Sequence, residues 1–375
     1  MATVNQATDV TRCTRESQQA ASMMLGARLL LGTVLLLGAA LSFAASQAAV
    51  GGEFALTDGK PAEVGMRDET LRAAVATMSS AVERGEIRGA VVLVARRGRI
   101  VLHEAVGWAD FGAKRPMQRD TVFHVASNTK PVLAAATLQL VEQGKLDLDV
   151  DVGNYLPAFE KEAYRGVTLR RLLSHTSGLR IGPIFIEPLS AKSAELPGGP
   201  TLQSEVARFA ALAPEVKPGT SYSYNNPGFN IVGAVIEKVT GQPIDVVLER
   251  QIYKPLEMTS TGHVDRSGLV ERRAVIETRK GDAWTKTYKP GDPPKYPFVR
   301  SSGGMLTTAS DYAKFLQLFL NEGRHLGHEL LKPRSVAAAT TALTRSIYTD
   351  EQLKKQTSFY GLGWAVGVDG TFSHG

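Results

Sequence analysis

A short apolar run that leads into an apolar helix, residues 122–144, constrains this chain more than any other stretch. After Pro131, the segment Val132–Glu142 is rich in good helix formers. Ser127 and Lys130 stand between the apolar run and the helix, three residues apart. Residues with that spacing share one face of a helix. The pattern therefore predicts an amine within reach of a serine hydroxyl at a helix N-terminus.

This Ser-x-x-Lys pair is suited to nucleophilic catalysis. A serine hydroxyl needs a neighbour that takes its proton, and a lysine does so if burial lowers its pKa. Backbone N–H groups at a helix N-terminus favour an oxyanion forming beside Ser127. The alternative is an N-capping Ser127 with Lys130 on the surface, and this motif alone does not separate the two.

Composition excludes some functions. The chain has 375 residues, of which 43% are hydrophobic and 21% charged, as in globular proteins. Its net charge of +6 is mild for this length, and no basic block stands out. The sequence therefore predicts no nucleic-acid partner.

Residues 1–49 are predicted to be a polar leader and signal peptide, followed by one domain over residues 50–375. Arg28 precedes the apolar run Leu29–Leu41, and small residues follow it. This arrangement is typical of a secretory signal and predicts a periplasmic or secreted protein. The alternative is an uncut anchor in the inner membrane. Cys13, the single cysteine, lies upstream, so a processed chain has no disulfide.

A second motif follows about a hundred residues after the first. The loop 218–226 offers Tyr224 and Asn226, separated by one residue. Tyr224 as a phenolate is predicted to relay a proton to a leaving group, and Asn226 to orient Lys130 or a substrate amide. The alternatives are a core tyrosine and a turn residue before Pro227.

Other segments are given structural roles. His175 is predicted to bond the backbone, and Ser302 with the two glycines after it to form a tight turn near the site. Residues Gly182–Pro200 are predicted to be a surface loop. Residues 90–107 are predicted to form a hairpin whose first strand is central in a sheet. Amphipathic or apolar patterns predict helices over Arg67–Glu86, Val167–Leu173, Thr201–Leu212, Gly228–Thr240, Ile244–Ile252, Ala309–Asn321 and Pro333–Thr341. Further strands are predicted over Ala274–Thr278, over Tyr360–Val366 and from Thr371.

Together these motifs resemble the serine β-lactamase and penicillin-binding-protein superfamily. The similarity is greatest to the branch of class C β-lactamases, D-alanyl-D-alanine carboxypeptidases and family VIII-type esterases, and extends from about Gly89 to the last residue. It rests on the order and spacing of Ser127–Lys130, Leu172–Leu179, Pro218–Thr220 with Tyr224–Asn226, Ser302–Asp311 and Phe372–Gly375.

The resemblance implies a role for each matching position. Ser127 would be the acylated nucleophile, Lys130 the general base, and Tyr224 a group that assists proton transfer. Asn226 would contact substrate. His374–Gly375 would begin the third motif and bind substrate. A histidine there weakly favours ester or amide hydrolysis over efficient β-lactam hydrolysis. The oxyanion hole of the family pairs the nucleophile's own N–H with one from the strand after the third motif.

The chain stops inside that third motif, at Gly375. We expect C-terminal strands to be missing, so that the domain is a fragment or a truncated product with low activity on its own. The implied fold is α+β, of the β-lactamase/transpeptidase type. An antiparallel sheet flanked by helices, from residues 67–126 and 300–375, is expected to meet a mostly helical part, residues 131–300, with Ser127 between them.

The sequence thus predicts a serine hydrolase that forms an acyl-enzyme on an ester, a D-amino-acid amide or a β-lactam. No metal or organic cofactor is implied. The expected partner is a small-molecule or peptide substrate, association with the cell wall is left open, and no stable membrane span is expected once the signal is cleaved. The alternative is a non-catalytic relative that binds a peptide or cell-wall ligand in the same cleft.

Overall fold

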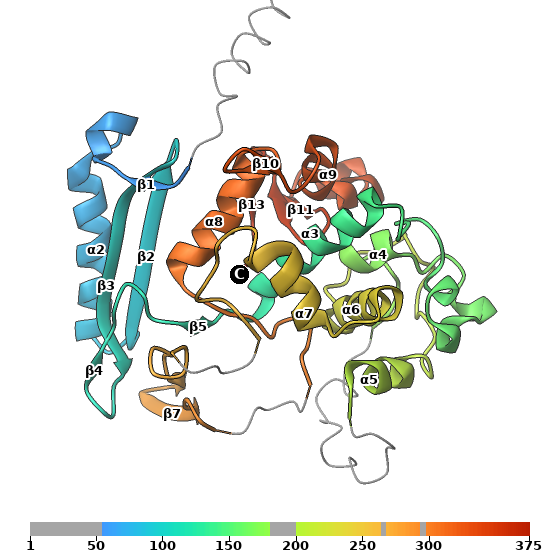
Figure 1. Cartoon of the computed structure of the whole chain (residues 1–375), viewed down its shortest axis with the longest axis horizontal. Helices are drawn as coiled ribbons and strands as arrows, with labels where there is room; N and C mark the ends of the chain where they lie inside the picture. Colours follow the sequence, from blue (N-terminus) through green and yellow to red (C-terminus); the bar gives the residue numbers. More distant parts are fainter. Residues whose placement is uncertain (1–54, 181–199, 264–267, 293–297) are drawn as a thin grey trace, which may run out of the picture. The chain divides into compact units, whose positions relative to one another are not determined.

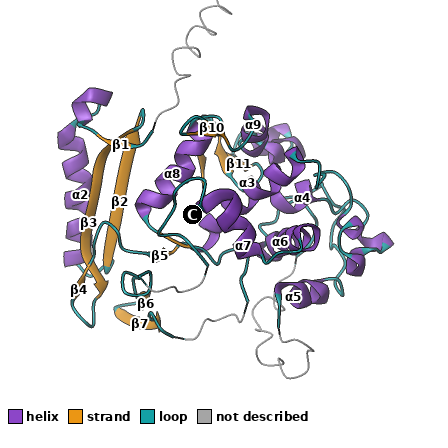
Figure 2. Ribbon diagram, viewed as in Figure 1, coloured by secondary structure: helices purple, strands orange, loops and turns teal. Residues whose placement is uncertain are grey.

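The computed structural model describes residues 55–180, 200–263, 268–292 and 298–375. The predicted leader, residues 1–49, and nearly all of the predicted loop Gly182–Pro200 lie outside this part of the chain. Within it, helices and strands mix in an α+β architecture (Figure 2). No helix among these residues is long and apolar enough to cross a membrane.

A long hairpin forms the N-terminal sheet. Strand β2 (Gly89–Arg96) pairs antiparallel with β3 (Arg99–Asp110). Arg97 and Gly98 between them both have positive φ, as a two-residue hairpin turn requires. The prediction that β2 is central was wrong for the described sheet. Its neighbour β3 is central, because β1 (Thr57–Asp58) pairs with β3 in parallel on the other side.

Helices cover both faces of this sheet. Helix α2 (Asp68–Glu83) packs on β3 and α8 (Ala309–Leu320) packs on β2, so helices separated by more than 200 residues enclose one hairpin (Figure 1). Both helices were predicted from the apolar periodicity.

Helix α3 (Thr129–Glu142) lies inside the helical part. It contacts α6 (Asn226–Thr240), α7 (Ile244–Leu248) and α9 (Pro333–Ala339). All its residues from Thr129 to Leu140 are buried. The helix begins two residues before Pro131, so the proline occupies the third helical position, where its missing N–H costs no intrahelical bond.

The C-terminal strands differ from the prediction. Residues Tyr360–Val366 do not form one strand. β11 (Ser358–Tyr360) ends and β12 (Ala365–Gly367) begins across a turn in which Gly363 has a φ of 78°. Strand β13 (Phe372–Ser373) adds to β12. These strands and the β2–β3 hairpin, predicted to share one antiparallel sheet, form separate sheets among the described residues.

A two-residue pairing joins the two sequence regions that matter for the site. Strand β5 (Phe123–His124) pairs with β8 (Leu306–Thr307). Residues 125–130 therefore lie beside residues 300–305. The remaining described elements are β4 (Arg115–Pro116), α4 (Leu169–Leu173), α5 (Leu202–Phe209), a π-helical turn (Glu249–Tyr253), β6 (Ile276–Lys280), β7 (Ala283–Tyr288), β9 (Arg324–His325), β10 (His328–Glu329), α10 (Asp350–Leu353) and short 3-10 turns.

Candidate active site

Ser127 lies in a 3-10 turn, Ala126–Asn128, immediately before α3. Ala126 has a φ of 45°, a left-handed conformation that is uncommon for a residue with a side chain. The Thr129 hydroxyl holds the turn, because it donates to the Ala126 carbonyl at 2.7 Å and accepts the Met305 N–H at 3.1 Å. The N-cap of α3 is Asn128, so the alternative that Ser127 caps this helix was wrong.

Lys130, the second residue of α3, is fully buried. Its Nζ donates to Ser127 Oγ at 2.9 Å, to Asn226 Oδ1 at 2.6 Å and to the Ser302 carbonyl at 2.7 Å. The alternative of a surface lysine was therefore also wrong. The most distant acceptor lies 172 residues from Lys130 in the sequence, and together the three fix the amine beside the serine oxygen.

Burial lowers the pKa of Lys130 to about 7, and the positive charge of Arg300 acts in the same direction. A buried ammonium loses its hydration, which favours the neutral amine. At neutral pH a large fraction of Lys130 is therefore able to accept the Ser127 proton.

Tyr224 contacts the same serine oxygen from the other motif. Its hydroxyl donates to Ser127 Oγ at 2.8 Å. Burial raises the pKa of Tyr224 above its usual value, and only the hydrogen bond with Ser127 opposes this. The phenol therefore stays protonated at neutral pH, and the predicted phenolate was wrong. Tyr224 is placed to donate a proton, while Lys130 is placed to accept one.

The loop before α6 is held by His175. Its Nδ1 accepts the Asn225 backbone N–H at 3.0 Å, as the predicted backbone-bonding role requires. Its ring lies 4.3 Å from the Tyr224 ring, centroid to centroid. The Asn225 side chain caps α6 by accepting the Gly228 N–H at 2.9 Å. Asn226 is consequently the first residue of the helix, not a turn residue, and its amide points at Lys130.

His374 lies near this cluster at the end of β13. Its Nε2 is 2.8 Å from the Tyr360 hydroxyl, and its ring centroid is 6.4 Å from that of Tyr224. Burial lowers the pKa of His374 to about 4, and the charge of Lys130 contributes. The imidazole is therefore neutral at pH 7.

A hollow of about 390 Å³ opens beside Tyr224 and His374. Its walls are mostly aromatic or polar and come from the loop before α6, from the segment 344–356 and from the C-terminal strands. They are formed by Tyr222, Tyr224, Thr344, Tyr348, Gln356, Ser358, Phe359, Tyr360, Ala365, Ser373, His374 and Gly375. The structure thus brings both predicted residues of the third motif to the same hollow as Tyr224.

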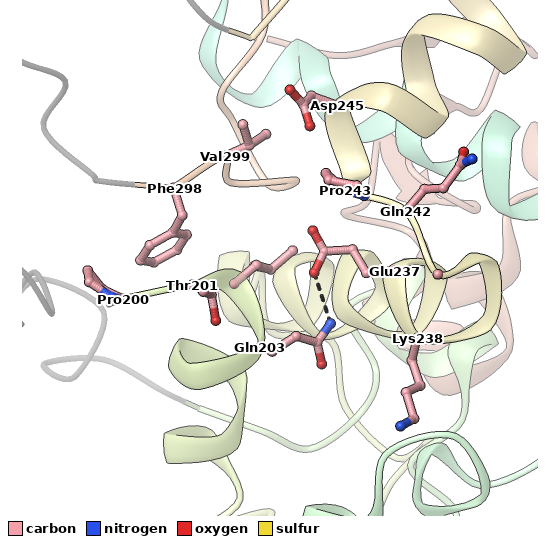
Figure 3. Close-up of a pocket in the computed structure, with 12 residues that line it drawn as sticks. Pro200, Thr201, Gln203, Glu237, Lys238, Gln242, Pro243, Asp245, Phe298 and Val299 are labelled. Atoms are coloured by element: carbon pink, nitrogen blue, oxygen red, sulfur yellow. Dashed lines mark hydrogen bonds between the residues drawn. The ribbon is translucent and has the colours of Figure 1, made fainter. Parts of the chain in front are cut away.

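A larger hollow, of about 690 Å³, lies elsewhere, between α5, the end of α6 and the start of α7 (Figure 3). Gln203 donates to Glu237 across its floor at 2.9 Å. None of the predicted site residues lines it. Within the described ranges no group of three His, Cys, Asp or Glu side chains is arranged to hold a metal ion.

Sequence reasoning missed the residues behind Lys130. The Ser302 carbonyl was expected only to shape a turn, yet it accepts directly from the amine. Glu205, Asn230 and Arg300 lie behind that carbonyl in one hydrogen-bonded chain. No local signal points to them, because they are 25 to 95 residues apart in the sequence.

Comparison with known proteins identifies the family of this chain. The family model described as Beta-lactamase matches residues 70–375. Protein Rv1367c of Mycobacterium tuberculosis is 30% identical over 310 residues, covering 78% of this chain and 75% of that protein. Esterase EstB of Burkholderia gladioli is 36% identical over 210 residues, 53% of each chain. The solved structure of EstCE1, a hydrolase with promiscuous acyltransferase activity, has a TM-score of 0.67 and 26% identity, and the match covers 80% of this chain and 84% of EstCE1.

Proposed function

Because this chain belongs to the beta-lactamase family of hydrolases, which has esterases among its members, we propose that it is a serine hydrolase that forms an acyl-enzyme on Ser127. One observation carries the proposal. Ser127 Oγ has the Lys130 amine at 2.9 Å and the Tyr224 hydroxyl at 2.8 Å, an acceptor and a donor of protons on one nucleophile.

The proton path follows from these contacts. Neutral Lys130 takes the Ser127 proton as Oγ bonds to the substrate carbonyl carbon, and the carbonyl electron pair moves to oxygen. When the intermediate collapses, the bond to the leaving group breaks and Tyr224 protonates the departing oxygen. The Lys130 ammonium, whose Nζ lies 4.9 Å from the centroid of the Tyr224 ring, then returns a proton to Tyr224. Water then attacks the acyl carbon by the same route, which releases the acid and restores Ser127.

The charge state of residue 374 favours uncharged esters over β-lactams and D-amino-acid amides. The latter two carry a carboxylate, which is best held by a cation. The family's third motif supplies a lysine in β-lactamases, whereas this chain has His374, neutral at pH 7. The aromatic hollow beside it suits a flat or apolar acyl or alcohol group. We therefore propose an ester of an apolar group as the preferred substrate.

Intact-mass spectrometry after exposure to a fluorophosphonate tests the nucleophile. It is run on this chain and, where the reading frame continues, on the product of the whole frame. We expect one adduct per chain, lost in Ser127→Ala. The matched control is Ser302→Ala, which keeps the backbone carbonyl used by Lys130 and is expected to label normally.

Hydrolysis of 4-nitrophenyl butyrate, 4-nitrophenyl benzoate and nitrocefin then tests the substrate class. We expect both esters to be hydrolysed at least ten times faster than nitrocefin, judged by kcat/KM. Faster nitrocefin hydrolysis would overturn the ester preference. Folded protein that forms no fluorophosphonate adduct would overturn the proposal that the chain is an enzyme and favour a ligand-binding relative.

Export is proposed separately, on the apolar run Leu29–Leu41 and the small residues after it. The N-terminal sequence of the protein purified from the cell envelope and medium tests it. A start near residue 49 is the expected result, and an intact N-terminus in the membrane fraction would favour the uncut anchor.

A further inference from the structure

A buried pair of opposite charges lies behind the site, and the proposed mechanism does not use it. Arg300 Nη2 donates to Glu205 Oε1 at 2.7 Å, and each side chain is only 6% exposed. Burying two charges costs much of the energy that their attraction returns, so an apolar pair of similar size stabilises a fold as well or better. A fold-stabilising role alone is therefore a weak explanation for this pair.

The pair is linked to the catalytic amine by continuous hydrogen bonds. Glu205 Oε2 accepts from Asn230 Nδ2 at 3.0 Å, and Asn230 Oδ1 accepts the Ser302 N–H at 3.0 Å. The Ser302 carbonyl then accepts from Lys130 Nζ at 2.7 Å. Each link is buried, so water does not compete for these bonds.

The backbone that carries the Ser302 carbonyl is also packed tightly against α6. The Ser301 hydroxyl donates to the Phe229 carbonyl at 2.9 Å. A Cβ at Gly233 would lie 2.1 Å from Ser301 Oγ, so only glycine allows this approach. The carbonyl thus has little freedom to move away from Lys130.

Several ionisable groups face Lys130 from the elements around it. Tyr224 stays a neutral phenol, and burial lowers the pKa values of His175 and His374, so both are neutral at pH 7. Arg300 carries the positive charge that disfavours the ammonium form of Lys130. Burial raises the pKa of Glu205, whereas its bonds to Arg300 and Asn230 oppose that shift and favour the carboxylate, which offsets part of the Arg300 charge.

We propose that Glu205, Arg300 and Asn230 are positioning residues that hold the Ser302 carbonyl on Lys130 and set the balance of charge around its amine. The inference rests on the proposed function, because it concerns the base of that reaction. It predicts that the two charged residues act on Lys130 in opposite directions.

The test is the pH dependence of fluorophosphonate labelling at Ser127, whose rise with pH reports the pKa of the base in the free enzyme. Glu205→Gln removes the negative charge that is bonded to Arg300, so the midpoint should fall by about half to one pH unit. Arg300→Gln removes the cation, so the midpoint should rise by a similar amount. The double variant should lie between the two single variants.

Further variants separate charge from position. Arg300→Lys keeps the charge and should leave the midpoint unchanged while slowing labelling. Asn230→Ala breaks the link to Ser302 and should slow labelling about tenfold, also without moving the midpoint. The matched control is the ion pair between Arg88 and Glu277 on the hairpins, 2.8 Å long and partly buried. Arg88→Gln and Glu277→Gln should change neither rate nor midpoint.

Thermal unfolding of each variant shows whether it is folded. If a glutamine variant does not fold, Arg300→Lys and Asn230→Ala still test the inference. Midpoints that stay within 0.2 pH unit of the unaltered chain, or that shift in one direction for both glutamine variants, would overturn the inference. So would normal labelling by Asn230→Ala. Absence of labelling in the unaltered chain is a different result, because it overturns the proposed function itself.

Discussion

Helices α3 and α2 are of similar length but lie in very different surroundings. α3 has 14 residues, of which those from Thr129 to Leu140 are all buried. α2 has 16 residues, of which only Leu71 is buried. Three consecutive alanines after Leu133 let neighbouring helices approach α3 closely, whereas α2 rests one face on β3.

The difference shows what the nucleophile needs from the fold. A helix packed on every side excludes water from Lys130 and so lowers its pKa to about 7. A lysine on a helix such as α2 would keep its hydration and its proton. In the proposed mechanism, enclosure of α3, more than the Ser-x-x-Lys spacing, is what would let Lys130 act as the base.

Replacement of the base should have the largest effect. Lys130→Met is expected to slow labelling of Ser127 about a thousandfold, because Lys130 is the proposed proton acceptor and its amine lies 2.9 Å from Ser127 Oγ. Stability should be kept or improved, since the cost of a buried amine disappears. Arg72→Met on α2, which breaks an exposed ion pair with Asp68, should alter neither quantity. Comparable loss of labelling in both variants would remove the distinction between the helices.

Truncation of an apolar side chain should have the next largest effect, and it should lower the free energy of unfolding more on α3 than on α2. Leu133→Ala on α3 is expected to lower the free energy of unfolding by about 2–5 kcal/mol, because Leu133 is fully buried and leaves a cavity. Val75→Ala on α2, where the side chain is only partly buried, should cost less than about 1 kcal/mol. Urea unfolding measures both, and equal costs would mean that α2 is packed as firmly as α3.

The lowered pKa of Lys130 should also make the free energy of unfolding depend on pH. Between about pH 7 and its ordinary value of 10.5, the unfolded chain holds a proton on Lys130 that the folded chain has lost. The free energy of unfolding should therefore rise with pH in this range, by up to about 1.4 kcal/mol per pH unit relative to Lys130→Met. Below pH 7 the folded and the unfolded chain both hold the proton on Lys130. The difference in free energy of unfolding between the unaltered protein and Lys130→Met should therefore level off. Parallel curves for the two proteins would show that Lys130 titrates normally.

The smallest expected effect on the free energy of unfolding is at a matched pair of threonines. Thr137 on α3 and Thr77 on α2 each donate to the carbonyl four residues earlier, at 2.8 and 2.9 Å. Replacement by serine keeps that bond and removes one methyl group. Thr137→Ser should cost about 1 kcal/mol, because its methyl is buried, and Thr77→Ser should cost nothing measurable. The same cost at both positions would argue against the contrast in burial.

The sequence predicted the local features of this protein well. Apolar periodicity predicted α2 and α8, and the helix formers after Pro131 predicted α3, each within a few residues. The Ser-x-x-Lys spacing correctly placed the Lys130 amine beside Ser127, and their roles as base and nucleophile remain predictions. Errors arose where backbone geometry decided. Positive φ at Gly363 divided the predicted strand Tyr360–Val366, and a second partner for β3 left β2 at the edge of its sheet.

The sequence by itself determined which groups were available for catalysis and which of them share a helix face, because these depend on residue type and on spacings of three or four. Only the tertiary structure decided that Lys130 is buried, that Asn226 and the Ser302 carbonyl meet its amine from 96 and 172 residues away, and that the Tyr224 hydroxyl reaches Ser127 Oγ from 97 residues away. Burial and long-range contact set the pKa of each group, and neither is written in any local pattern.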